Sequence, residues 1–162
     1  MELEKAKVIA DDILTQLRPY CDKIAVVGSI RRKKSWERDI DIVCIPDNQG
    51  QFVYALQTLG RIKVGGQKLI RCELQGISLD VYIATPETWS TLLLIRTGSA
   101  AHNIKLCTLA KRNGMKLHAD GSGLFKIEAQ GCEGIEVRIA GDTETSIFEA
   151  LGLPYVAPER RN

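Results

Sequence analysis

Residues 23–45 have the sequence KIAVVGSIRRKKSWERDIDIVCI, and this stretch is the most informative about the fold. It begins with a β-branched run over 23–27 that ends at Gly28, which is typical of a buried strand. It ends with an alternating segment over 39–45, which predicts a second strand stopped by Pro46. Between the two strands lie a Gly-Ser pair, a basic cluster and a charged loop. The connection is therefore a candidate for functional side chains and is longer than a simple turn.

Two aspartates stand two residues apart in the second strand. Side chains at i and i+2 of a strand point to one face, so Asp39 and Asp41 project together while Ile40 and Ile42 point into a core. Adjacent carboxylates repel one another unless a cation relieves the repulsion, and oxygen ligands of this kind suit Mg²⁺. Asp-x-Asp pairs are also common on exposed strand edges, so the pair alone indicates a metal site only weakly.

A third carboxylate stands in the strand predicted over 77–83. Leu79, Val81 and Ile83 form one face of that strand, and Asp80 lies on the other. Two interpretations are open. Asp80 is either a solvated residue paired with a nearby Arg or Lys, or a third metal ligand. In the second case two neighbouring strands would supply three carboxylates to a two-metal site.

The pair Gly28-Ser29 follows a strand and precedes a short basic segment that is expected to be helical. Glycine allows a tight turn, and Ser29 with the free N–H groups of a following helix can hold phosphate oxygens. Arg32 can add a bidentate contact. Nine residues separate Ser29 from Asp39, so a phosphate cradle is predicted beside a metal site, as a nucleoside triphosphate with Mg²⁺ requires. The sequence has no Walker-type loop ending in Gly-Lys-Ser/Thr.

This spacing resembles the signature of the polymerase-β-like nucleotidyltransferases. Three further features resemble, more narrowly, the X-family DNA polymerases: the strand that carries Asp80, the turn Thr97-Gly98-Ser99 with His102-Asn103, and the segments 123–126, 149–155 and 158–160. The resemblance covers nearly all 162 residues. It implies an α+β fold: a nucleotidyltransferase (polymerase-β-like) palm over 1–98, with a mixed β-sheet and flanking helices, and a small α/β thumb over 99–162.

The resemblance also implies a function and the residues that perform it. The function is template-directed DNA synthesis at a primer 3′-hydroxyl, in gap-filling repair, with two Mg²⁺ ions for which Mn²⁺ can substitute. Asp39, Asp41 and Asp80 would be the catalytic metal ligands. The residues implied to bind the nucleotide are Gly28, Ser29, Arg32, Thr97, Gly98, Ser99 and Asn103. The basic residues expected at DNA phosphates are Lys33, Lys34, Lys105, Lys111, Arg112, Lys126 and Arg160.

The sequence departs from the family pattern in places. Nothing before Lys23 is long enough for a lyase or fingers domain, and the C-terminal phosphoesterase domain of many bacterial relatives does not follow. We therefore expect no lyase activity and a weaker hold on DNA. The family usually has an aromatic pair just before Thr-Gly-Ser, one member of which crowds the sugar 2′ position. This chain has Ile95-Arg96 there, which predicts weak sugar discrimination. Cys107 replaces an arginine that touches the template strand, which bears on fidelity.

The composition of the chain limits the classes of protein to which it can belong. A hydrophobic fraction of 44% and a net charge of +2 suit a globular protein. The sequence shows no membrane span or signal peptide, so a cytoplasmic monomer is expected, with gapped or primer-template DNA and nucleoside triphosphates as partners. Five single cysteines suit neither a disulfide framework nor a zinc site, and Cys44 is interpreted as a small buried hydrophobe. Trp36 and Trp89 are interpreted as packing residues.

The remaining elements follow from periodicity and from turn residues. Thr143 is a predicted N-cap and Gly152 a predicted C-cap glycine. The predicted helices are 3–18, 49–59, 86–95 with Pro86 in its first turn, 100–112 and 144–151. The predicted further strands are 61–64, 68–74, 115–118, 124–128 and 135–139.

Two other functional classes stay open. A nucleotidyltransferase of the same superfamily that modifies a small molecule, a protein or an RNA end would share the Gly-Ser pair and the aspartates, but it would not need the polymerase-like tail. A catalytically inactive nucleic-acid-binding scaffold is disfavoured because all three carboxylates are present.

Overall fold

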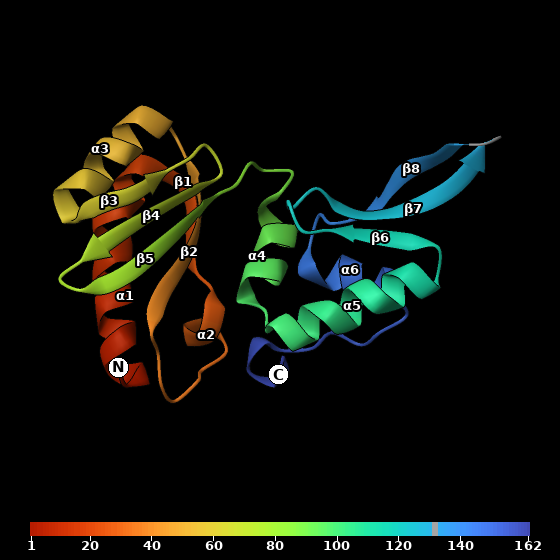
Figure 1. The fold of residues 1–162 in the computed structure, drawn as a ribbon, viewed down its shortest axis with the longest axis horizontal. Helices are drawn as coiled ribbons and strands as arrows, with labels where there is room; N and C mark the ends of the chain where they lie inside the picture. The colour runs from red at the N-terminus through yellow and green to blue at the C-terminus, as the bar shows by residue number, and fades with distance from the viewer. Residues whose placement is uncertain (131–132) are drawn as a thin grey trace. The chain divides into compact units, whose positions relative to one another are not determined.

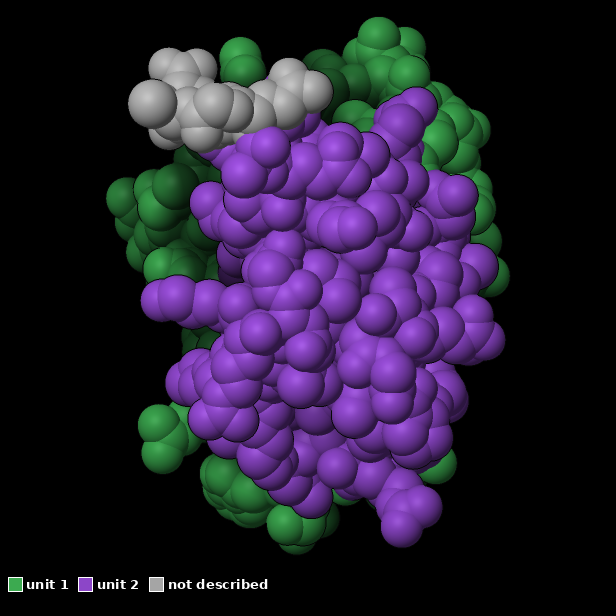
Figure 2. Space-filling model, turned by 90° about the vertical axis from the view of Figure 1, so that its right-hand side faces the viewer, with its two compact units in different colours: residues 1–86 green, residues 87–162 purple. Residues whose placement is uncertain are grey.

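The computed structural model describes residues 1–130 and 133–162 (Figure 1). The chain divides into two compact units, Met1–Pro86 and Glu87–Asn162, which Figure 2 colours separately. This division falls before the predicted boundary at residue 98, because α4 (Trp89–Thr97) contributes Leu94 and Ile95 to the core of the second unit. Cys132, one of the five single cysteines, lies outside the described residues.

The first unit is a five-stranded sheet with helices (Figure 1). The predicted elements of this unit are confirmed to within two residues at each end. Their observed bounds are α1 Leu3–Leu17, η1 Arg18–Tyr20, β1 Cys21–Val26, α2 Gly28–Arg31, β2 Asp39–Pro46, α3 Gln49–Leu59, β3 Arg61–Gly65, β4 Leu69–Leu74 and β5 Ile77–Ile83.

The sheet is mixed, as predicted, with strand order β1-β2-β5-β4-β3. β2 and β5 are parallel, and the other neighbours are antiparallel. In the β2–β5 register Asp41 stands opposite Asp80, and Asp39 stands opposite Ser78. Paired residues of neighbouring strands share a face of the sheet, so the three aspartates lie on one face.

The opposite face of the sheet forms the core of the first unit. Ile40, Ile42, Leu79 and Val81 have no exposed surface and pack in one cluster with residues of α1 and α3. Full burial of such a side chain stabilises the fold by roughly 1.5–3 kcal/mol. This core therefore fixes which face of the sheet the aspartates occupy.

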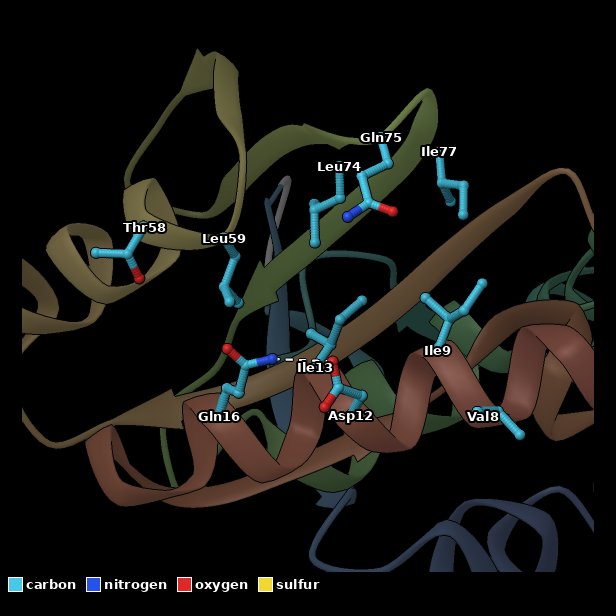
Figure 3. A pocket seen from close by; sticks show the side chains of 10 residues that line it. All are labelled: Val8, Ile9, Asp12, Ile13, Gln16, Thr58, Leu59, Leu74, Gln75 and Ile77. Atoms are coloured by element: carbon cyan, nitrogen blue, oxygen red, sulfur yellow. Dashed lines mark hydrogen bonds between the residues drawn. The ribbon is translucent and has the colours of Figure 1, made fainter.

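A pocket of about 440 Å³ opens on the helical side of this unit (Figure 3). Its walls come from α1, from the end of α3 and from the turn between β4 and β5, and none of the three aspartates lines it. In the close view Gln16 donates a hydrogen bond of 2.9 Å to Asp12 along α1. The pocket is therefore separate from the aspartate face.

The second unit contains α4, α5 Ala100–Arg112, α6 Glu144–Ala150, η2 Pro158–Arg160 and an antiparallel sheet of β6 Met115–His118, β7 Gly123–Gln130 and β8 Glu133–Ala140. The predicted cap is confirmed, since Thr143 accepts the Ser146 N–H at 3.0 Å.

The predicted start of a helix at Pro86 is wrong. Residues 86–88 form a turn, and the helical hydrogen bonds of α4 begin with the Leu92 N–H and the Thr88 carbonyl. Gly152 has φ +71° and follows Leu151, the residue after the end of α6, which suits its predicted role as a glycine at the helix C-terminus.

Within residues 1–130 and 133–162, no helix is long and apolar enough to cross a membrane. Cys44 is fully buried, which confirms its interpretation as a small core residue.

Candidate active site

Two parallel strands present the three aspartates. Asp39 is exposed at the start of β2, Asp41 is half-buried, and Asp80 on β5 is 7% exposed. Within the described part of the chain, no three His, Cys, Asp or Glu side chains are grouped closely enough to hold a metal ion. The backbone therefore brings the predicted ligands side by side, while their role as a metal-ligand set stays a prediction.

Arg71 engages the carboxylate of Asp80. It stands opposite Asp80 on β4, and its Nε and Nη2 donate to Oδ1 and Oδ2 at 2.6 Å each. This hydrogen bonding, together with the charge of Asp80, raises the pKa of the Arg71 guanidinium. The Arg partner of the first interpretation is thus present, although Asp80 is buried rather than solvated. Each carboxylate oxygen has a second lone pair, so the ion pair leaves acceptor sites for a cation.

The turn at Gly28 fits closely against Asp41. The Val27 N–H donates to the Asp41 carbonyl at 2.9 Å, which ties the turn to β2. Gly28 has φ +64°, and a Cβ at this position would lie 3.0 Å from Cγ and 3.1 Å from Cβ of Asp41, and closer still to Oδ2. Glycine is therefore required here both for the backbone conformation and for the space that the carboxylate occupies.

A basic pocket of about 400 Å³ adjoins Asp39. Burial lowers the pKa of the Arg32 guanidinium, while the charges of Glu37 and then Asp41 oppose that shift. Trp36 is 66% exposed, so its interpretation as a packing residue is wrong. Cations and hydroxyls dominate the lining, as an anion site requires. The lining residues are Ser29, Arg32, Lys34, Ser35, Trp36, Arg38 and Asp39.

Glu37 is a site residue that the sequence analysis missed. It lies in the loop before β2 and is 1% exposed, and Ser29 donates its hydroxyl to Oε2 of Glu37. In sequence Glu37 is one charge within a mixed run of charges, so no periodicity marked it as buried.

The turn Thr97-Gly98-Ser99, which is predicted to bind the nucleotide, lies in the second unit. Thr97 and Gly98 are buried, and the Ser99 side chain caps α5. The Asn103 amide donates to the Ile95 carbonyl at 2.8 Å, while its Oδ1 is buried and accepts no hydrogen bond within the described residues. The Ile95 side chain belongs to the core of this unit.

Arg161, also missed in the sequence analysis, supports that turn. Its carbonyl accepts the Ser99 N–H at 3.2 Å. Its fully buried guanidinium donates to Glu144 at 2.8 Å and lies 5.4 Å and 5.5 Å from the ring centres of Phe148 and Tyr155. The C-terminal tail is thereby fastened beside the turn.

The basic residues predicted to contact DNA are at the surface. Lys34 is half-buried in the basic pocket, and the others are exposed. Exposure is what DNA contact requires, but it is also the ordinary state of lysine and arginine. Their role stays a prediction. The exposed residues are Lys33, Lys105, Lys111, Arg112, Lys126 and Arg160.

Comparison with known proteins matches residues 92–162 to the family described as DNA polymerase beta thumb. DNA polymerase lambda of Rattus norvegicus is 31% identical over 160 residues, and the match covers 83% of this chain. The DNA polymerase/3′-5′ exonuclease PolX of Bacillus subtilis is 28% identical over 145 residues, covering 86% of this chain. The Repair DNA polymerase X of African swine fever virus is 26% identical over 148 residues, covering 85% of this chain.

The chain spans different shares of these relatives. It covers 28% of the rat protein and 24% of the Bacillus protein, but 80% of the viral one. The matches with the rat and Bacillus proteins thus concern about a quarter of the length of those proteins. The match with the viral protein extends over most of the viral protein's length.

Proposed function

Because the chain belongs to the X family of DNA polymerases, we propose that it is a template-directed DNA polymerase that adds nucleotides to a primer 3′-hydroxyl in gap-filling repair. In this proposal the unit Met1–Pro86 is a polymerase-β-like nucleotidyltransferase palm, and the C-terminal part is the thumb.

One observation carries the proposal. Asp41 and Asp80 are direct neighbours on parallel strands, with Asp39 on the same face, and the basic pocket with Ser29 and Arg32 adjoins Asp39. Phosphoryl transfer depends chiefly on positioning the reactants and on balancing negative charge. Carboxylates beside an anion pocket provide groups for both tasks.

In this proposal the carboxylates of the aspartate face supply the type of ligand that divalent ions require. Asp41 lies in a cradle that a Cβ on Gly28 would fill, and oxygen ligands from carboxylates with substrate phosphates suit Mg²⁺. Asp39, Asp41 and Asp80 would hold the ions, with Mn²⁺ as a substitute. When bound, the ions would lower the pKa of the attacking hydroxyl and balance the charge of the triphosphate.

The protein's own groups bind and orient the substrates. Ser29 and Arg32 hold the outer phosphates of the nucleotide through a hydroxyl donor and a guanidinium fork. Asp80 would help activate the primer 3′-hydroxyl by accepting its proton. The turn Thr97-Gly98-Ser99 would lie against the sugar, and Asn103 would contact the nascent base pair. DNA is held mainly through phosphates, so its binding weakens steeply with salt.

Extension of a labelled primer across a short gap tests the proposal. Asp80→Asn should lower the rate by roughly a hundredfold or more, because it removes a proton acceptor and an anionic ligand. Asp11→Asn is the matched control, since Asp11 is an exposed aspartate of α1. Running deoxy- and ribonucleotides in parallel tests whether Ile95-Arg96 lacks a sugar gate.

Templated addition that Asp80→Asn abolishes and Asp11→Asn preserves is the expected result. No addition at any salt or divalent-metal concentration would refute the polymerase proposal. Small-molecule, protein and RNA-end acceptors would then be the substrates to try on the same aspartates.

A further inference from the structure

A buried carboxylate lies beside the phosphate cradle. Glu37 stands between two exposed residues, Trp36 and Arg38, yet only 1% of its own surface is exposed. Carboxylates are rarely buried without partners, because removal from water penalises the charged form. The hydrogen-bond partner here is Ser29, whose hydroxyl donates to Oε2 of Glu37.

The other oxygen of this carboxylate has no such partner. Oε1 of Glu37 is buried, and no residue in the described parts of the chain donates a hydrogen bond to it. Glu37 also acts on Arg32: burial lowers the pKa of that guanidinium, and the negative charge of Glu37 is the largest opposing influence. Glu37 thus accepts a hydrogen bond from the same hydroxyl, and its charge acts on the same cation, that the proposed function assigns to the triphosphate.

We propose that Glu37 is an internal competitor of the nucleotide's phosphates and sets the affinity of the site. The inference rests on the proposed function of Ser29 and Arg32 and deepens it. A hydroxyl has one proton to donate, so Ser29 cannot serve Glu37 and a phosphate oxygen at once. When the nucleotide binds, Ser29 must therefore give up its hydrogen bond to Glu37 in order to donate to the phosphate.

That exchange is costly for two reasons. It removes the Ser29 donor from Oε2, so neither oxygen of the buried carboxylate then accepts a hydrogen bond from the described residues. It also brings phosphate charge close to the negative charge of Glu37. The nucleotide is therefore held more weakly than the cradle alone would hold it. Glu37 is a positioning residue in this scheme, because it acts through Ser29 and Arg32 and not on the reacting atoms.

Calorimetric titration with inorganic tripolyphosphate, and separately with dATP, each with Mg²⁺, tests the inference. Glu37→Gln keeps the size, removes the charge and can donate its amide to Ser29, which frees the hydroxyl proton. We expect roughly tenfold tighter binding of both probes. In gap extension the KM for the nucleotide should fall by a similar factor while kcat changes little, a split that general loosening of the fold would not produce.

Two further variants make the test specific. Glu37→Leu also removes the charge, at similar volume, and should tighten binding in the same direction, so the test survives if Glu37→Gln folds poorly. In the Ser29→Ala background the gain from Glu37→Gln should be smaller, because the part of the cost that comes from the Ser29 hydrogen bond is then absent. Thermal unfolding of each variant confirms that folded proteins are compared.

The outcomes separate this inference from the proposed function. Unchanged or weaker tripolyphosphate binding in both Glu37 variants would overturn it and make Glu37 a support of the cradle. Failure of every variant to bind tripolyphosphate would overturn it too. Tighter binding without any Asp80-dependent primer extension would leave the inference standing and refute the polymerase function.

Discussion

Replacing Gly28 with alanine should reduce activity far more than it reduces stability. The added Cβ would lie 3.0 Å from Cγ and 3.1 Å from Cβ of Asp41, and closer still to Oδ2. Ordinary contacts between carbon atoms begin at about 3.5 Å. The Asp41 carboxylate must therefore withdraw by about 1 Å, because it is the side chain that fills this space.

The two expected effects differ in size. At φ +64° an L-residue is strained by about 1–2 kcal/mol, which is the expected loss in the free energy of unfolding. Misplacing a group in a catalytic site by about 1 Å can lower the rate by roughly a hundredfold. Gly28→Ala should thus keep its fold, with a modestly lower stability, and lose nearly all gap-filling activity.

Gly76→Ala is the matched control. Gly76 lies in the same unit, in the turn between β4 and β5, with φ +81°, and a Cβ there would meet nothing within 4 Å. It should suffer a similar backbone penalty and keep its activity. Urea unfolding and single-gap extension at saturating nucleotide measure the two quantities. Equal activity losses in both variants would refute the argument that Gly28 serves to place Asp41.

Two further predictions concern charged groups. Arg71→Met should let Asp80 bind a divalent ion more readily, so the Mg²⁺ concentration for half-maximal extension should fall several-fold; a rise would show instead that Arg71 orients Asp80 for the ion. Burial, with the charges of Arg161 and Lys105, lowers the pKa of His102 to about 4 from its ordinary 6.5. The neutral ring therefore stabilises the fold fully above pH 6.5, and this contribution is lost as the pH falls toward about 4. Between pH 7 and 4.5 the free energy of unfolding should fall by on the order of 2 kcal/mol more in the wild type than in His102→Leu; equal losses would contradict it.

Local patterns in the sequence were sufficient to predict most of the helices and strands. Alternation over 39–45 and 77–83 places Asp39 and Asp41 on one face of their strand and Asp80 on the polar face of another, because side chains alternate along any strand. The two-residue turn at Gln75-Gly76 even implies the partner of Asp80. Arg71 and Asp80 are equally distant from that turn and must face each other across the hairpin.

By itself, therefore, the sequence determined most of the helices and strands, the faces that carry the aspartates and the glycine turn after β1, because each depends on residues close together in the chain. Only the tertiary structure decided that β2 and β5 are parallel neighbours, that Glu37 is buried against Ser29, that Trp36 stays exposed, and that α4 joins the second unit. These outcomes depend on which surfaces meet after the chain folds, and the burial of a side chain is set by the segments that pack over it rather than by its neighbours in sequence.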